Sequence, residues 1–256
     1  MRIIRVEHGG TSYYGILEDG LVFRLHQQPG HMEPIPLSEA QVLPLVTPSK
    51  VVCVGLNYKA HAEELGYPLP NMPSFFLKPP SSIIGNGEPI VLPSGMGRIE
   101  HEAELAMVVG KVCRNLTPEE AEESLFGFTC ANDVTAREVQ KVDPLIGHCK
   151  SYDTFCPIGP WIETELEDIN DLSIRCLVNG EVRQSANTGD MIFRPLDLLC
   201  FLSRVMTLMP GDVILTGTPP GISPIQADDV VQVSIEGIGT LSNPVEGPGP
   251  EEKILQ

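Results

Sequence analysis

The stretch Glu100-His101-Glu102-Ala103-Glu104-Leu105-Ala106-Met107-Val108-Val109-Gly110 has the pattern of a buried strand interrupted by carboxylates. Side chains on a strand alternate between two faces, so Glu102 and Glu104 point the same way, and Ala106 and Val108 follow on that face. Two like charges at this spacing repel, and the stretch itself holds no Lys or Arg to pair with them. A multivalent cation bound by carboxylate oxygens would turn the repulsion into a binding site. A solvated strand face is the other interpretation, and spacing alone leaves both open.

Asp133 is the third carboxylate that such a cation would use. It lies at the end of a second apolar stretch, Thr129-Cys130-Ala131-Asn132-Asp133. Its carboxylate can complete the set of hard oxygen ligands for such a cation.

Composition limits the kinds of partner. The chain has 256 residues, 42% of them hydrophobic, which is enough for a folded core in one large domain or one domain with a small addition. It carries 34 acidic against 17 basic residues, a formal net charge of −17. This charge argues against nucleic acid or an anionic membrane as a partner. A small anionic substrate remains compatible, because a bound metal ion reverses the charge locally.

The seven cysteines form no Cys-x-x-Cys pair, so neither a zinc ribbon nor a dithiol redox motif is expected. Reduced thiols within apolar runs are typical of a cytosolic protein. The first residues lack the apolar core of a signal peptide, and no apolar run reaches membrane-spanning length. We therefore expect a soluble, cytoplasmic protein.

The pattern of turns and apolar runs predicts an α+β protein that is mainly β. Residues 1–48 read as a small β-rich N-terminal domain with strands at 3–7, 13–17 and 21–25, ending in a proline-rich connector over 33–48. Residues 49–247 then form the main domain, and 248–256 form a C-terminal tail. Short apolar runs at 50–55, 174–178, 212–216 and 230–236 predict strands, and Asn179-Gly180 predicts a hairpin.

Three helices are expected in the main domain. The first covers 57–66, with Asn57 as its N-cap and Gly66 at its end. The second covers 118–126, with Thr117 as N-cap and Glu120 at the capping-box position. The third covers 195–206 and has Pro in its first turn.

Single motifs remain ambiguous. His61 and Glu64 share a face of the first helix, but such a pair is more often exposed than catalytic. Lys150, in Lys150-Ser151-Tyr152-Asp153-Thr154-Phe155, reads by itself as a surface lysine. Thr216-Gly217-Thr218-Pro219-Pro220-Gly221 lacks the Gly-Lys-Ser/Thr ending of a P-loop and is read as a structural turn whose hydroxyls can face a site. No zincin motif or serine-hydrolase elbow is present.

Taken together, five separated motifs resemble the fumarylacetoacetate hydrolase family, in order and with compatible spacing from about Val51 to Val245. They are Glu102-x-Glu104, Phe76-Leu77-Lys78-Pro79, the segment from Asp133 to Gln140, the segment from Lys150 to Phe155, and Leu215-Thr216-Gly217-Thr218-Pro219. The resemblance implies a mixed β-roll for the main domain and a homodimer. The chain is more similar to the smaller members of the family. Only about 48 residues precede its main domain, whereas fumarylacetoacetase proper has a much longer N-terminal domain.

The resemblance also implies roles for residues. By motif position, Glu102, Glu104 and Asp133 bind Mg²⁺ or Mn²⁺, and Lys150 lines the site as a catalytic cation. His61 with Glu64 matches a His-x-x-Glu pair that moves protons from a short, lid-like helix. The residues assigned to substrate binding are Lys78, Arg137, Gln140 and Thr218.

The implied function is a Mg²⁺-dependent reaction on a small 2-oxo or enol acid through a metal-stabilised enolate. Acylpyruvate-type C–C hydrolysis and oxaloacetate-like decarboxylation come first. Isomerisation of 2-hydroxyhepta-2,4-diene-1,7-dioate is the alternative within the family. A non-catalytic, metal-stabilised β-rich binding domain is the alternative outside enzymes.

Overall fold

A long mixed sheet organises the protein, whose computed structural model describes residues 1–25, 33–143 and 145–247. Within these residues the sheet has twelve strands, with hydrogen bonding along the path β4-β3-β2-β1-β14-β12-β11-β17-β6-β7, and with β5 added to β1 and β8 to β14. The strands are β1 (Arg2–His8), β2 (Thr11–Glu18), β3 (Leu21–Arg24), β4 (Ile35–Pro36), β5 (Gln41–Val42), β6 (Val51–Gly55), β7 (Ser74–Lys78), β8 (Ile83–Ile84), β11 (Ala103–Val109), β12 (Leu125–Asn132), β14 (Cys156–Glu163) and β17 (Val213–Leu215).

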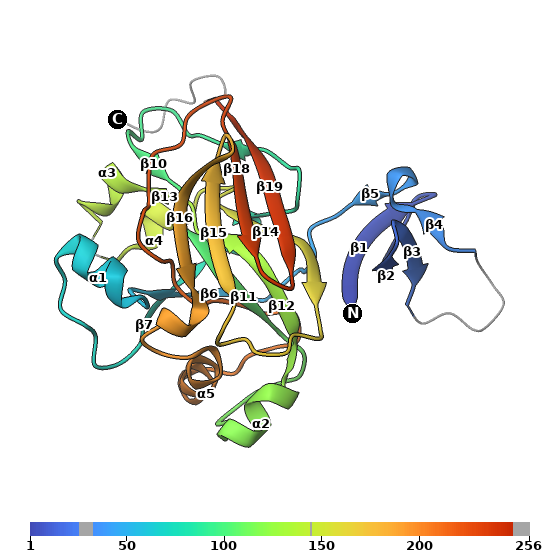
Figure 1. Cartoon of the computed structure of the whole chain (residues 1–256), viewed down its shortest axis with the longest axis horizontal. Coiled ribbons are helices and arrows are strands. Elements are labelled where there is room, and N and C mark those ends of the chain that lie inside the picture. Colours follow the sequence, from blue (N-terminus) through green and yellow to red (C-terminus); the bar gives the residue numbers. More distant parts are fainter. Residues whose placement is uncertain (26–32, 144, 248–256) are drawn as a thin grey trace.

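A second sheet packs against the centre of the first and has the strand order β16-β15-β18-β19-β9 (Figure 1). Its strands are β9 (Ile90–Val91), β15 (Ser173–Val178), β16 (Glu181–Asn187), β18 (Val230–Ile235) and β19 (Gly239–Glu246). A short pair, β10 (Ile99–Glu100) and β13 (Thr135–Ala136), stands apart from both. The prediction of a mainly β, α+β fold with a mixed sheet is confirmed.

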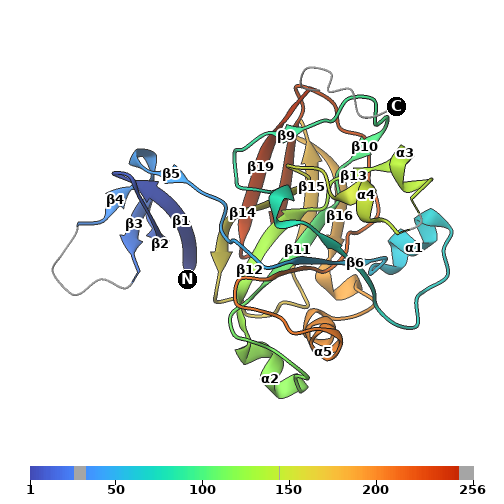
Figure 2. The ribbon, with the colours of Figure 1, turned by 180° about the vertical axis from the view of Figure 1, so that it is seen from behind.

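The helices are short and lie around the sheets (Figure 2). They are α1 (Lys59–Leu65), α2 (Pro118–Glu123), α3 (Arg137–Gln140), α4 (Gly147–Lys150) and α5 (Pro195–Val205), with 3₁₀ turns at Leu37–Glu39, Pro80–Ser82 and Thr188–Asp190. In both views α1, α3 and α4 lie on one side of the molecule, which is where the site is built. No helix among the described residues is long and apolar enough to cross a membrane.

Strand β11 is buried on both faces, which explains its nearly unbroken apolar sequence. Leu105 and Met107 join a core that includes residues of both sheets, whereas Ala106 and Val108 join a second core with the N-terminal strands. The predicted strand is interrupted, however. β10 ends at Glu100 and β11 begins at Ala103, so Glu102 lies just before β11 and Glu104 lies within it.

Most local predictions are confirmed. Asn179 and Gly180 turn between β15 and β16 with positive φ angles of 53° and 80°, as a type I′ hairpin requires. Gly66 ends α1 in the left-handed conformation, with φ of 70°. Thr117 and Glu120 form the expected capping box of α2. That helix ends at Glu123 rather than at 126, because β12 begins at Leu125, which pairs with β11.

The N-cap predicted at Asn57 is wrong. Helix α1 begins at Lys59, and no side chain caps it. Asn57 is fully buried, and its amide nitrogen instead donates to the carbonyl oxygens of Phe193 (2.9 Å) and Thr216 (2.7 Å). Tertiary hydrogen bonds therefore take the side chain that a local rule assigns to the helix.

The proline-rich segment 33–48 is more structured than a connector. Within it, β4 pairs with β3 and β5 pairs with β1. Pro36 is tolerated in β4 because this strand lies at the sheet edge, where a missing N–H costs no internal hydrogen bond. Residues 26–32 and the predicted tail 248–256 lie outside the described residues.

The five N-terminal strands are set to one side in Figure 1. They join the rest of the twelve-stranded sheet through the pairing of β1 with β14, where Arg2 pairs with Glu163 and Ile3 with Ile162. We keep the division of the chain at residue 48 as a proposal, which this arrangement supports.

The capping box of α2 generates a stability prediction. Thr117→Ala removes the hydroxyl that accepts from the Glu120 N–H, so it should lower the free energy of unfolding by about 1 kcal/mol. Thr117→Ser keeps the hydroxyl and is the control. Urea unfolding of both variants measures the difference. An equal loss of unfolding free energy in Thr117→Ala and Thr117→Ser would show that the methyl group of Thr117, and not the cap, stabilises the protein.

Candidate active site

Three carboxylates converge at one end of β11. In the β11–β12 ladder Ala103 pairs with Asn132, so the next residues outward, Glu102 and Asp133, come face to face. The backbone N–H of Asp133 donates to the carbonyl of Glu102 at 2.9 Å. One oxygen from each of Glu102, Glu104 and Asp133 lies within 4.8 Å of the others, and all three residues are buried. The structure thus brings together the three residues that the sequence singled out as metal ligands.

Two buried lysines face this cluster. Lys150 ends α4, and its Nζ lies 2.7 Å from both Glu102 Oε2 and Asp133 Oδ2. Lys78 ends β7, and its Nζ donates to Asp133 Oδ1 and to the carbonyl of Phe155 at 2.7 Å. Lys150 is therefore no surface lysine, and its ammonium also lies 5.1 Å from the centre of the Phe76 ring.

Glu104 differs from the other two carboxylates. Its Oε2 accepts a hydrogen bond from the Gly217 N–H at 2.5 Å. Among the described residues no Lys or Arg forms an ion pair with it. Glu104 is thus a buried acid with a single backbone donor and two acidic neighbours.

These surroundings move the pKa values in opposite directions. Burial disfavours the charged form of Glu102, but Lys150 and Arg137 outweigh it and hold the Glu102 pKa far below its ordinary value of 4.5. For Glu104, burial acts first and the charges of Asp133 and Glu102 add to it, so its pKa lies well above 4.5. Lys150 is buried too, yet Asp133 and Glu102 raise its pKa and keep it cationic.

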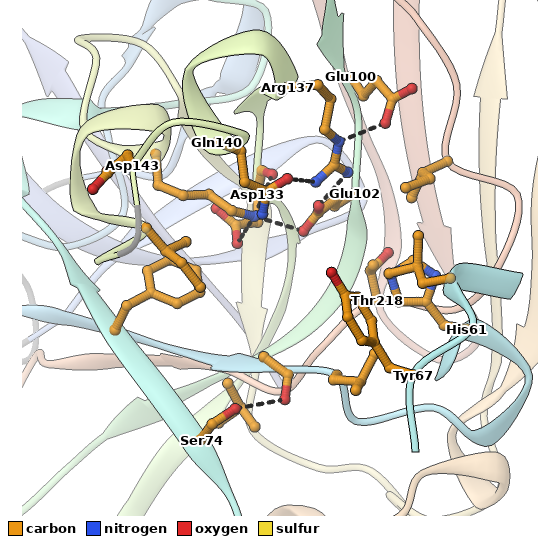
Figure 3. A pocket seen from close by; sticks show the side chains of 18 of the residues that line it. His61, Tyr67, Ser74, Glu100, Glu102, Asp133, Arg137, Gln140, Asp143 and Thr218 are labelled. Carbon is orange, nitrogen blue, oxygen red and sulfur yellow. Dashed lines mark hydrogen bonds and ion pairs between the residues drawn. The ribbon is translucent and has the colours of Figure 1, made fainter. Parts of the chain in front are cut away.

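Arg137 begins α3 and fixes the upper part of the site (Figure 3). Its guanidinium donates to Glu100 at 2.6 Å, to Glu102 at 2.5 Å and to the side-chain oxygen of Gln140 at 2.9 Å. Arg98 forms an ion pair with the other oxygen of Glu100. Two arginines therefore hold Glu100, and one of them also orients Glu102.

His61 and Glu64 form a hydrogen-bonded pair on α1. His61 Nδ1 lies 2.8 Å from Glu64 Oε2, and the other oxygen of Glu64 accepts from the Gly221 N–H at 3.0 Å. An ionised carboxylate can only accept a hydrogen bond, so Nδ1 of His61 carries the hydrogen. In the neutral ring Nε2 then carries the lone pair. His61 is 5% exposed and lines the cavity, as Figure 3 shows.

A cavity of about 710 Å³ connects these groups. Of the residues predicted from the sequence, those that line it are His61, Glu102, Glu104, Asp133, Arg137, Gln140, Lys150 and Thr218. Glu64 and Lys78 are not in its wall. Lys78 lies behind Asp133, where three oxygens surround its ammonium, so it is an ion-pair partner of Asp133 and does not belong to the cavity wall. The Thr218 hydroxyl donates to the carbonyl of Ala103 and accepts from Gln184.

Sequence reasoning missed other residues of the wall. Glu100 is the first residue of the acidic stretch that leads into β11, and Arg98 lies two residues before it; these charges just ahead of a buried strand were an available signal. Tyr67 and Ile146 also line the cavity, on the segment after α1 and before α4. Nothing in their local sequence distinguishes them from ordinary loop residues.

The residues present fit a hard divalent cation. Three carboxylates offer oxygen ligands of the type that Mg²⁺ and Mn²⁺ prefer. Burial and the charges of Asp133 and Glu102 raise the Glu104 pKa, Lys150 opposes this shift only in part, and a bound dication would lower the pKa further. The acidic triad can therefore hold such an ion.

Comparison with known proteins agrees with this geometry. Residues 50–246 match the family described as fumarylacetoacetate (FAA) hydrolase, C-terminal, which is more than half of the chain. The chain belongs to the fumarylacetoacetate hydrolase family. Residues 1–44 match a second family, described as Rv2993c-like, N-terminal, so the two matches meet close to the proposed boundary at residue 48.

The named relatives are enzymes that act on small organic acids. Human mitochondrial oxaloacetate tautomerase FAHD2A is 42% identical over 225 residues, which cover 82% of this chain and 71% of that protein. The structure of 5-carboxymethyl-2-hydroxymuconate delta-isomerase from Mycobacterium smegmatis matches with a TM-score of 0.90 and 42% identity, covering 98% of this chain and 100% of that chain. Maleylpyruvate hydrolase from Sphingobium sp. SYK-6, in complex with manganese(II) and pyruvate, matches with a TM-score of 0.82 and 31% identity, covering 97% and 100%. The protein is thus an enzyme of this family.

The opposite pKa shifts predict opposite effects of two isosteric variants in metal-free protein. Ionised Glu104 is unfavourable in the folded state, so Glu104→Gln should raise stability at pH 7, with a gain that starts near pH 4.5 and grows as pH rises toward the raised folded pKa. Ionised Glu102 is stabilised, so Glu102→Gln should lose about 3–5 kcal/mol at pH 7, as expected when a buried ion pair loses one partner. That loss should shrink as pH falls below 4.5.

Thermal unfolding of both variants and of the wild type, in chelator at pH 4 and pH 7, measures these changes. Each variant is the control of the other, because both replace one carboxyl group of the same cluster by an amide of the same shape. Changes of the same sign at pH 7 would contradict the charge distribution described for the triad.

Proposed function

We propose that this protein is a Mg²⁺-dependent enzyme that converts a small 2-oxo or enol acid through an enolate. The observation that carries the proposal is the meeting, in one cavity, of three buried carboxylates, a buried ammonium and a histidine held by a glutamate. The first two groups fit a chelated anionic head group, and the third fits proton transfer beside it.

Glu102, Glu104 and Asp133 would hold the ion. When bound, Mg²⁺ acts as a Lewis acid that stabilises negative charge on the keto oxygen of a 2-oxo acid. The manganese and pyruvate in the complex of the maleylpyruvate hydrolase relative support this assignment. Mn²⁺ is expected to replace Mg²⁺, because both take oxygen ligands.

Lys150 contributes a fixed positive charge to the same place. Two carboxylates keep it protonated, and it lines the cavity despite being only 3% exposed. Its charge would stabilise an enolate that develops beside the three carboxylates, without having to reorganise. Arg137 and Gln140, on the same wall, are proposed to hold other oxygens of the substrate.

His61 is proposed to move the proton. Because its Nδ1–H is held by Glu64, Nε2 is the basic atom, and the glutamate stabilises the imidazolium that forms when Nε2 accepts a proton. Removal of the proton from the carbon next to the keto group leaves the enolate. Return of the proton to oxygen, or to a carbon farther along a conjugated chain, completes a tautomerisation or an isomerisation.

Among reactions that share this enolate, we place proton transfer first. The relatives named tautomerase and isomerase are each 42% identical to this chain, whereas the maleylpyruvate hydrolase is 31% identical. The sequence alone had put C–C hydrolysis and decarboxylation first. Hydrolysis remains the second candidate, because His61 can equally activate a water molecule for attack on a distal carbonyl. Decarboxylation of an oxaloacetate-like acid needs only the enolate.

A non-catalytic binding domain is not supported, because the family comprises enzymes and a structural cation site needs no His-Glu pair. We further propose a homodimer in the cytoplasm. The homodimer depends on the family resemblance. The cytoplasmic location is supported by seven cysteines that are all free and buried.

The role of His61 can be tested separately from metal binding. His61→Asn should lower the Mg²⁺-dependent rate by about 10²- to 10⁴-fold, because it removes the base but none of the carboxylates. The assay is a panel of oxaloacetate, acetylpyruvate and 2-hydroxyhepta-2,4-diene-1,7-dioate, with products identified by NMR in D₂O so that exchange at the carbon next to the keto group is seen directly.

The matched control is His8→Asn, at the end of β1 and away from the cavity. Mn²⁺ affinity of the His61 variant, measured by titration calorimetry, should equal that of the wild type. A His61 variant that exchanges and turns over every substrate at the wild-type rate would rule out the proposed base.

A further inference from the structure

A buried polar network surrounds Ala103, the residue between the two glutamate ligands. Gln184, on β16 of the second sheet, is fully buried, and so is His101, which directly precedes Glu102. The Gln184 side chain contacts the Ala103 N–H, His101, Thr218 and the carbonyl of Pro219. The proposed mechanism assigns no task to Gln184 or His101.

Backbone groups fix the orientation of the Gln184 amide. The Ala103 N–H, 3.0 Å away, can only donate, so it faces Oε1. The Pro219 carbonyl, 2.7 Å away, can only accept, so it faces Nε2. The second hydrogen of Nε2 goes to Thr218 Oγ1 at 2.8 Å, and the second lone pair of Oε1 faces His101 Nδ1 at 3.0 Å. All four hydrogen-bonding positions of this side chain are therefore used.

The same orientation sets the histidine. Because Oε1 can only accept, His101 Nδ1 must carry the hydrogen. The other ring nitrogen lies 2.8 Å from Ser223 Oγ, so His101 joins Gln184 to the far end of the loop that starts after β17. Gln184, on the second sheet, thus contacts one end of the segment 217–223, and His101, just before β11 of the first sheet, contacts the other end.

This segment contacts both the proposed metal ligands and the proposed proton-transfer pair. Its Gly217 N–H donates to Glu104, and its Gly221 N–H donates to Glu64. Thr218 Oγ1 donates to the Ala103 carbonyl at 2.9 Å, so the network ties both backbone groups of the residue that separates Glu102 from Glu104. Figure 3 shows Thr218 and His61 on the same side of the cavity.

We propose that Gln184, oriented with His101, is the positioning residue of this site. It fixes the spacing of the two glutamate ligands through Ala103, and it fixes the position of the His61–Glu64 pair through the 217–223 segment. The inference rests on the proposed function. Outer residues of this kind typically change metal affinity or activity by 10- to 100-fold when they are lost.

The test is Gln184→Met, which keeps the length of the side chain and removes all of its hydrogen bonds. We expect Mn²⁺ to bind about 10- to 100-fold more weakly, measured by titration calorimetry on the full chain, with kcat reduced at saturating Mn²⁺. Asn243→Leu is the matched control. Asn243 is a buried amide that donates to the carbonyls of Gly85 and Glu88, away from the cavity, so its variant should lose stability and keep the Mn²⁺ affinity of the wild type.

A pair of His101 variants gives an independent measurement if Gln184→Met folds poorly. In His101→Asn the amide nitrogen takes the place of Nδ1 and still donates to Gln184, whereas His101→Leu has no donor. The asparagine variant should bind Mn²⁺ more tightly than the leucine variant. Equal affinity in both, or wild-type affinity and kcat in Gln184→Met, would overturn the positioning role. A wild type that binds no Mn²⁺ would instead refute the proposed function, and the positioning role with it.

Discussion

Charge buried away from water is the constraint on which this structure depends. Glu102, Glu104 and Asp133 lie within one small cluster, and an isolated carboxylate in such a place costs several kcal/mol of free energy relative to water. Lys78 and Lys150 offset two of these charges by direct ion pairs. Glu104 is left with a backbone donor and a raised pKa. Among the described residues Glu104 is therefore the one carboxylate of the three without an ion pair, and we propose that a bound metal ion supplies the missing positive charge there.

The mixed sheet is the means by which these charges meet. The carboxylates come from one antiparallel pair of strands, β11 and β12, whose register places Glu102 opposite Asp133. The cations arrive on separate elements, Lys78 from an edge strand and Lys150 from a short helix. Because β11 is buried on both faces, its carboxylate end cannot move toward solvent without disturbing two cores. A buried strand pair thus supports the three carboxylates, while His61 is carried by a peripheral helix that contacts the cavity.

The sequence predicted the parts of this arrangement that depend on local pattern. Alternation along the chain placed Glu104 on one face with Ala106 and Val108, and Asn179-Gly180 defined a hairpin, because both features follow from the geometry of neighbouring residues. It did not predict the ion pair between Arg137 and Glu102, or the burial of Lys150, because these depend on long-range contacts. The same reason explains the failed cap at Asn57, whose side chain bonds residues more than 130 positions away. Gln184 carried no local signal, since the role proposed for it comes from a contact between two sheets.

Anomalous diffraction from crystals grown with Mn²⁺ tests the central claim most directly. The account predicts one strong anomalous peak in the cavity, within about 2.0–2.6 Å of oxygens from Glu102, Glu104 and Asp133, as hard divalent cations bind in proteins. It also predicts that Lys150 and Lys78 keep their contacts, because Asp133 and Glu102 have further lone pairs to share. A map with full Mn²⁺ occupancy elsewhere and none among these three carboxylates would contradict the account.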